Sequence, residues 1–252
     1  MHEQACQAVA DVIFAEAKTR LPVSLHSNVE AFQGDGRAAV AIVEAAKSSG
    51  AGLIVLGARG LGRMQELLLG SVSNSVVRSS HVPVLVVRGK HAESETLRVL
   101  LAYDTVHAAQ HADFLGKLVW PEGAEARVVA VMESMLPSHL PDWVQKRVRD
   151  SDTEAMSQAW IREHEREREV KEQELASYVE RLPPPFRSNP PAVAEGNPAE
   201  QLLAFAEREK PSIIVVGKAT KNFFDRLFVG SVSEKILAHA GCSVLVIPAS
   251  QA

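Results

Sequence analysis

The stretch "IIVVGKATKNFFDRLFVGSVSEKILAHAGCSVLVI", residues 213–247, decides the fold. Two short runs of β-branched and leucine side chains open and close it, and a helix-forming segment that begins at "GSVS" (230–233) lies between them. Short apolar runs that alternate with helices are typical of βαβ units, whose parallel strands are buried on both faces. The stretch therefore predicts an α/β protein with a doubly wound parallel sheet.

The same pattern occurs 160 residues earlier in the chain. Residues 36–88 align without a gap with residues 196–248, and 14 of the 53 aligned positions are identical. Both copies contain Gly-Ser-Val-Ser, and self-similarity at a fixed spacing indicates an internal duplication. A polar segment at 89–96 separates the copies. We therefore predict one domain at 1–88 and a second at 97–252.

The second copy also has a complete front half. We expect a strand at 97–103, a helix at 107–120, a strand at 126–132 and a long charged helix at about 142–181. A third strand must lie within 186–195, although the prolines there are unfavourable for a strand. Five strands with helices between them make a doubly wound domain.

The first copy lacks the corresponding front half. Counterparts of its first strand, first helix and second strand would precede Met1, so the sequence begins inside the second helix of that copy. We expect a remnant of three strands, with a sheet edge exposed where the missing first strand belongs. Three explanations stay open: a destabilised domain, completion by another chain, or a wrongly assigned start codon.

Composition argues against several classes of protein. The chain has 252 residues, a formal net charge of −4 and no basic block, which disfavours binding to nucleic-acid phosphates. Its two cysteines form neither a metal-ligand spacing nor a disulfide framework, which fits a reducing compartment. Residues 1–20 predict an amphipathic helix rather than a signal peptide, and no apolar run reaches the ~20 residues that span a bilayer. We expect a cytoplasmic protein.

The loop between the strand that ends at Gly217 and the following helix predicts an anion site. At Gly217 the chain must turn and a ligand can approach the backbone closely. We place Ser231 at the N-cap, where Gly230 leaves the N–H groups of the first turn open and the hydroxyls of Ser231 and Ser233 add hydrogen bonds. The same residues also fit a capped helix that binds nothing. The sequence contains no Walker A string.

The spacing of these residues resembles the signature of a known family. The first copy fits the pattern G-x2-G-x9-G-[ST] in full, and the second keeps the spacing with Thr220 in place of the middle glycine. Placed after a buried strand, this pattern resembles the ATP-binding signature of universal stress proteins, and the tandem arrangement is similar to two-domain members of that family. The resemblance covers nearly the whole chain. In the first copy it marks Gly57, Gly60, Gly70, Ser71, Val72 and Ser73.

The resemblance implies a fold and a ligand. The fold is a five-stranded parallel sheet of the adenine-nucleotide alpha hydrolase-like type, in the order 3-2-1-4-5, with the nucleotide at the carboxyl ends of strands 1, 2 and 4. The ligand would be ATP, ADP or AMP, with Mg²⁺ as an open addition. Asp104 would contact the nucleoside, and the Cβ of Thr220 restricts how closely the backbone approaches a phosphate. The residues implied in the second copy are Ala102, Asp104, Val131, Val216, Gly217, Thr220, Gly230, Ser231, Val232 and Ser233.

A histidine pair and a charged segment are both interpreted as structural features without a ligand. His107 and His111 lie four residues apart on a predicted helix, a spacing that can bind a metal, but no third ligand at a suitable spacing is evident, and we predict no metal site. The charge-dense segment 162–174 indicates a solvated helix with i,i+4 ion pairs, with a partner-binding helix as the alternative.

Our first functional hypothesis is a non-enzymatic regulator of the stress response that binds adenine nucleotide and responds by self-association or partner binding. The chain shows no general base near the phosphate loop and no Walker B carboxylate. A slow ATP hydrolase or nucleotidyl-transferring enzyme, and a dimerisation module that binds no nucleotide, stay open. The resemblance also implies that the last strands of the two domains, 82–88 and 242–248, pair edge to edge as an internal pseudo-dimer, with a homodimer as a further option.

Overall fold

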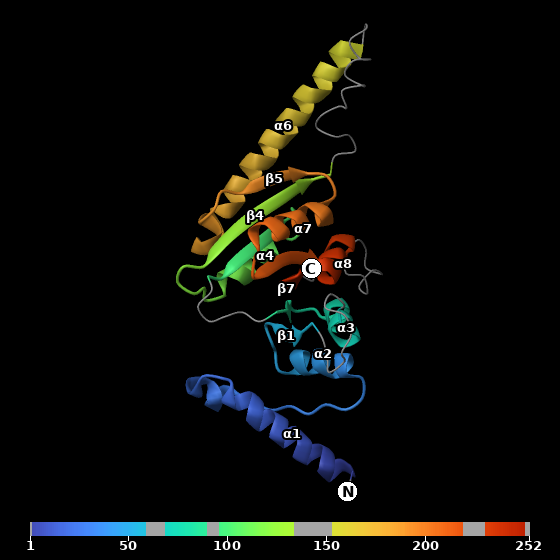
Figure 1. Ribbon diagram of the computed structural model, residues 1–252, viewed down its shortest axis with the longest axis vertical. Coiled ribbons are helices and arrows are strands. Elements are labelled where there is room, and N and C mark those ends of the chain that lie inside the picture. The colour runs from blue at the N-terminus through green and yellow to red at the C-terminus, as the bar shows by residue number, and fades with distance from the viewer. Residues whose placement is uncertain (1, 59–68, 90–95, 134–152, 219–229, 250–252) are drawn as a thin grey trace. The chain divides into compact units, whose positions relative to one another are not determined.

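The computed structural model describes residues 2–58, 69–89, 96–133, 153–218 and 230–249. The chain forms two compact units, Met1–Gly50 and Ala51–Ala252. The first unit contains α1 (His2–Thr19), the 3₁₀ helix η1 (Val23–Asn28) and α2 (Ala38–Ser48) (Figure 1). None of the helices in the described ranges is both long and apolar enough to cross a membrane.

Residues 29–37 of the first unit form no strand. The prediction of three strands in the first copy is therefore wrong, since the described part of that copy contributes only β1 (Ile54–Gly57) and β2 (Val84–Val87). The physical reason is that a strand needs a hydrogen-bonded neighbour. The expected neighbour, strand 2 of the same copy, has no counterpart in this sequence.

The second unit is built on a seven-stranded sheet in the order β1-β2-β7-β6-β3-β4-β5. Every pair is parallel except β2 and β7, which run antiparallel. The second copy thus has the order 3-2-1-4-5, as predicted. Its strands are β3 (Arg98–Tyr103), β4 (Glu125–Met132), β5 (Ala192–Glu195), β6 (Ile213–Lys218) and β7 (Ser243–Pro248).

Helices cover both faces of these strands. Leu101 and Tyr103 of β3 are buried with residues of α4 (Ala108–Gly116) and α6 (Thr153–Val179) in one apolar core. Leu100, whose side chain points to the opposite face, is also buried, and α7 (Pro198–Glu209) and α8 (Ser231–His239) contact β4 to β7. α4 is shorter than its predicted helix, and the start of the predicted long helix at 142–152 lies outside the described residues.

The two copies meet through their last strands, as the resemblance implied. Leu85 of β2 lies opposite Leu245 of β7, and these residues are 160 positions apart, so a local two-fold axis passes between them. α3 (Ser71–Ser79) and α8 lie on either side of this axis and share an ion pair, with 2.7 Å between Arg78 Nη2 and Glu234 Oε1. The sheet is therefore continuous across the two copies (Figure 1).

Buried cations connect the copies on both sides of the axis. The Arg88 guanidinium of the first copy donates to the carbonyls of Leu237 and Ala240 at the end of α8. The distance from Arg88 Nη1 to the Ala240 oxygen is 2.7 Å. The Lys218 ammonium of the second copy donates to the carbonyls of Arg78 and Ser80 at the end of α3. A cation at a helix C-terminus satisfies carbonyls that the helix leaves unpaired and favours the helix dipole. Each copy thus caps a helix of the other.

β1 forms one end of the sheet among the described strands, so the predicted exposed edge of the first copy is confirmed. Its equivalent, β6, has β3 as a further neighbour. The consequence is visible in one pair of equivalent residues, because Val55 is 56% exposed whereas Val215 is 0% exposed.

Candidate functional site

The site predicted in the second copy gathers at one edge of the sheet. β3 pairs with β4 through Ala102 and Val129 and with β6 through Leu101 and Val215, so the carboxyl ends of all three strands meet there. A hydrogen bond from α8 to the end of β6 brings the helix start to the same edge. The structure places predicted residues at the ends of β3 and β4 (Ala102, Asp104, Val131), at the end of β6 (Val216, Gly217) and at the start of α8 (Gly230, Ser231, Val232, Ser233), whereas Thr220 and Gly60 lie outside the described residues.

The N-cap of α8 is Gly230, not Ser231, which corrects our prediction by one residue. The Gly230 carbonyl accepts the first helical bond from the Glu234 N–H at 3.0 Å, and no side chain in the part of the chain that the structure describes caps the helix. The exposed Ser231 is the first helical residue. α3 begins in the same way at Gly70. An uncapped first turn leaves N–H groups unpaired, which suits an anion.

The second serine of each copy has a structural partner. The Ser233 hydroxyl donates to the Gly217 carbonyl at 2.5 Å, and the Ser73 hydroxyl donates to the Gly57 carbonyl at 2.8 Å. Both serines are buried. A hydroxyl has a single proton to donate, so in this arrangement neither donates to a phosphate. These serines hold the helix start against the preceding strand, and the hydroxyl available to a ligand is that of Ser231.

The Asp104 carboxylate organises the turn after β3. Its Oδ1 accepts from the N–H groups of Val106 at 2.7 Å and His107 at 3.0 Å, and its Oδ2 lies 2.7 Å from His107 Nδ1. Burial acts to raise the pKa of Asp104, but the hydrogen bonds and the charge of His107 outweigh it and hold that pKa below its ordinary value. The side chain is still 47% exposed, so it can accept further hydrogen bonds from a ligand.

His107 belongs to this site, although we considered it only as half of a metal-ligand spacing. Its ring is 2% exposed, and its Nε2 lies 2.9 Å from the carbonyl oxygen of Lys218. Burial acts to lower the pKa of His107, but its contact with Asp104 and the Lys218 carbonyl raises the pKa above its ordinary value. The Asp-x-x-His spacing hinted at the first contact. No local signal could have shown the second, which joins residues 111 positions apart.

Gly217 is a glycine because of this ring. A Cβ added at Gly217 would lie 2.5 Å from Cγ and Nδ1 of His107, far inside van der Waals contact. The sequence suggested a sharp turn and the approach of a ligand as reasons for this glycine. The close neighbour within the described residues is instead the imidazole, which fills the space beside the end of β6.

His111 lies one helical turn beyond His107 and is fully buried. The two rings stack, with 5.8 Å between their centroids, and neither nitrogen of His111 has a hydrogen-bond partner among the described residues. Burial and the nearby His107 lower the pKa of His111 to about 4. Within the described ranges no three His, Cys, Asp or Glu side chains are close enough to hold a metal ion.

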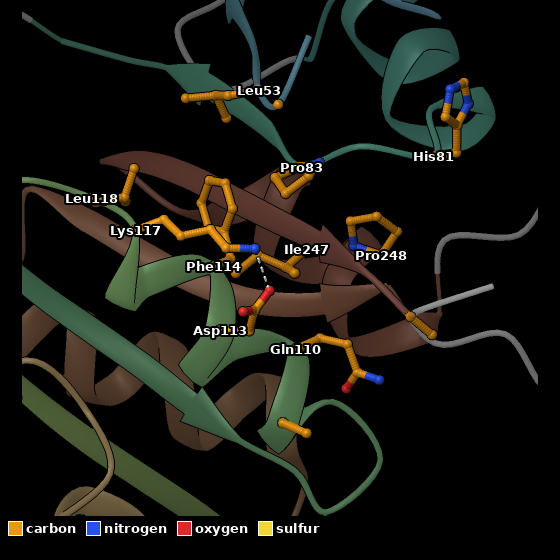
Figure 2. A pocket seen from close by; sticks show the side chains of 13 residues that line it. Leu53, His81, Pro83, Gln110, Asp113, Phe114, Lys117, Leu118, Ile247 and Pro248 are labelled. Atoms are coloured by element: carbon orange, nitrogen blue, oxygen red, sulfur yellow. Dashed lines mark hydrogen bonds and ion pairs between the residues drawn. The ribbon is translucent and has the colours of Figure 1, made fainter. Parts of the chain in front are cut away.

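A groove of about 690 Å³ lies on the outer side of α4, away from the predicted site (Figure 2). Phe114 of α4 and Lys117, which directly follows that helix, line one side, Leu53 and Pro83 lie across from them, and Ile247 also lines the groove. Lys117 is paired with Asp113 at 2.7 Å, drawn as the dashed line in the figure. None of the residues predicted to bind nucleotide lines this groove.

The profile of the universal stress protein family matches residues 2–88 and again residues 96–248. The chain belongs to the universal stress protein family. Its sequence is 28% identical over 208 residues to a universal stress protein of Mycolicibacterium smegmatis, which covers 82% of this chain and 64% of that protein. It is 26% identical over 203 residues to a universal stress protein of Mycobacterium tuberculosis, which covers 79% of this chain and 62% of that protein. The chain thus spans less than two thirds of either relative.

A solved universal stress protein structure supports the fold. The crystal structure from Archaeoglobus fulgidus aligns with 98% of this chain and 79% of its own, with a TM-score of 0.59 and 22% identity. The α/β architecture with its mostly parallel sheet is therefore that of the family. The family match has two parts that are divided near residues 89–95, whereas the compact units divide after Gly50. The domain boundary that we place at 89–96 stays a prediction.

Proposed function

We propose that this universal stress protein is a regulator that binds an adenine nucleotide, ATP, ADP or AMP, in its second copy. The observation that carries the proposal is the uncapped start of α8 beside the ends of β3 and β6. The strand order reverses there, because β4 lies on one side of β3 and β6 on the other. Ligands of open α/β sheets bind at such a reversal, and a free helix start favours phosphate.

Different parts of this edge would hold different parts of the nucleotide. The Ser231 hydroxyl and the N–H groups of residues 231–233 would bind the phosphates. The half-exposed Asp104 carboxylate would accept from nucleoside hydroxyls, since each of its oxygens accepts more than one hydrogen bond. Ala102 and Val131 would contact the base. Mg²⁺ would be carried chiefly by the phosphates, as is usual for this ion.

The first copy serves as an internal comparison. α3 begins at Gly70 with the same uncapped turn as α8, but β1 has no strand on its outer side among the strands that the structure describes. The start of α3 could bind a phosphate, as the start of α8 could. The described strands of the first copy provide no counterpart of Asp104 to hold a nucleoside. We propose a nucleotide site in the second copy only.

The response we propose is a change in association rather than catalysis, in the cytoplasm. Light scattering coupled to size-exclusion chromatography, with and without ATP, measures it directly. We expect the mass of the particle to depend on the nucleotide. A mass that ATP leaves unchanged would remove self-association from the proposal and leave partner binding.

Calorimetric titration with Mg-ATP tests nucleotide binding with a matched pair of variants. Ser231→Glu places a carboxylate at the start of α8, where it repels phosphate but suits the helix dipole, so the fold should tolerate it. Ser71→Glu makes the same change at the start of α3. We expect saturable binding by the wild type, about tenfold or weaker affinity for Ser231→Glu, and wild-type affinity for Ser71→Glu.

Two outcomes would count against this assignment. If the wild type shows no saturable binding, the chain is a module that binds no nucleotide. If both glutamate variants weaken binding equally, the site is not confined to the second copy. Steady-state phosphate release that disappears in Asp104→Ala would favour the hydrolase alternative instead.

A further inference from the structure

The His107 ring connects three elements at the candidate site. Nδ1 meets the Asp104 carboxylate after β3 at 2.7 Å, and Nε2 meets the Lys218 carbonyl at the end of β6 at 2.9 Å. The ring itself stands at the N-cap of α4 and rests against Gly217. It therefore joins the carboxyl ends of β3 and β6, beside the proposed nucleotide site.

Both partners of this ring are hydrogen-bond acceptors. A carboxylate and a carbonyl can only accept, whereas a neutral imidazole has a single N–H to donate. The bridge is therefore complete only when His107 is an imidazolium, with a proton on each nitrogen. A neutral ring would turn a lone pair toward either Asp104 or the Lys218 carbonyl at hydrogen-bond distance, and one side of the bridge would open.

The charged groups around the ring leave Asp104 as its counter-ion. The Lys218 ammonium donates to the carbonyls of Arg78 and Ser80 at the end of α3. Burial lowers the pKa of Lys218 to about 8, so this group also loses its charge between pH 6 and 9, and it does so in the wild type and in both histidine variants alike. His111, stacked on the other side, stays neutral at physiological pH because burial lowers its pKa to about 4. Loss of the His107 proton would thus leave the Asp104 negative charge uncompensated.

We propose that His107 is a positioning residue for the nucleotide, and that its protonation sets how tightly the site binds. The inference rests on the proposed function. The imidazolium holds the Asp104 carboxylate in one orientation, fixes the end of β6 against α4, and cancels a negative charge that would repel phosphates. Deprotonation removes all three effects, so affinity falls as pH rises through the pKa of His107, which its contact with Asp104 raises above the ordinary value.

The test is the pH dependence of ATP affinity between pH 6 and 9, measured for the wild type, His107→Gln and His81→Gln. His81 is an exposed histidine of the same chain, so its variant controls for loss of an imidazole. The phosphates of ATP also titrate, with a pKa of about 6, but equally for all three proteins. We expect the wild type and His81→Gln to lose about tenfold in affinity, and His107→Gln to bind weakly with little further loss.

A second measurement does not depend on the variant folding. The NMR titration of the His107 ring in the wild type should shift to higher pH by about one unit when ATP is bound, since linkage requires the two effects to be equal. An unchanged His107 titration, or a wild-type pH profile in His107→Gln, would overturn the inference while ATP binding still stands. Absence of binding at every pH would overturn the proposed function instead.

Discussion

Replacing His111 with leucine should remove a specific acid sensitivity of the fold. His111 is fully buried, and neither ring nitrogen has a partner among the described residues. Its pKa falls from 6.5 in the unfolded chain to about 4 in the folded protein. The unfolded chain therefore binds a proton at pH values where the folded protein cannot, and stability is present above pH 6.5 and lost as pH falls toward 4.

The magnitude follows from the width of that window. A difference of about 2.5 pKa units corresponds to about 3 kcal/mol of unfolding free energy, of which about 2 kcal/mol is lost by pH 5. The two neighbouring titratable groups, His107 and Asp104, change the stability at other pH values. His107, with a raised pKa, loses its contribution above pH 6.5, and Asp104, whose pKa lies below 3.8, loses its own below that value. The window between pH 4 and 6.5 thus isolates His111 within this cluster.

Urea unfolding at half-unit steps from pH 4.5 to 7.5 measures this loss. The difference in stability between His111→Leu and the wild type should grow in favour of the variant as pH falls, by about 2 kcal/mol between pH 7 and pH 5. His239→Leu, at an exposed helical histidine, controls for a leucine in place of imidazole. If His111→Leu keeps the wild-type pH dependence, the buried ring is not the neutral, unpaired group that the structure describes.

Three further predictions concern packing and hydrogen bonds, each read from urea unfolding at pH 7. Gly217→Ala should lower the free energy of unfolding by about 1–3 kcal/mol, because the added methyl clashes with the His107 ring. Adding His107→Ala to the same chain should restore most of that stability, whereas additive effects of the two substitutions would exclude the contact. Ser233→Ala should cost about 1–2 kcal/mol by leaving a carbonyl unpaired, whereas the exposed Ser231→Ala should cost less than about 0.5 kcal/mol, and equal costs would contradict the assignment. Arg88→Met should cost about 2–3 kcal/mol by uncapping the end of α8, and a change within about 0.5 kcal/mol would show that the cap is dispensable.

The sequence predicted those parts of the fold that depend on local pattern and on the repeat. The order β5-β4-β3-β6-β7 and the antiparallel pairing of β2 with β7 are as expected, and β5 forms directly after Pro190 and Pro191. The third strand expected in the first copy does not form among the described residues, because pairing depends on a neighbour that local sequence does not contain. The site was predicted less fully, since the His107 bridge joins residues far apart in the chain.

The serine assignments illustrate the same limit at the level of single atoms. A Gly-Ser-Val-Ser tetrapeptide signals a helix start, but the pattern alone does not say which residue is the cap or where each hydroxyl points. Gly230 takes the N-cap because the Glu234 N–H bonds to its carbonyl. Ser233 turns inward to the end of β6. The equivalent geometry at Ser73 indicates that this inward bond belongs to the fold of the repeat rather than to a ligand.

The first copy stabilises the second by covering its last strand and capping one of its helices. β7 is a run of valine, leucine and isoleucine, and as an uncovered edge it would be a template for pairing with other chains. β2 covers that edge, and Arg88 from the same copy caps α8, the helix whose start we propose as the phosphate site. Lys218 of the second copy makes the reverse contact, because its ammonium caps the end of α3 in the first copy. Its carbonyl contacts His107 within the second copy. Through these contacts the first copy supports the sheet and the end of α8, the helix whose start we propose as the phosphate site, and the Ser73 bond anchors the start of α3 to β1.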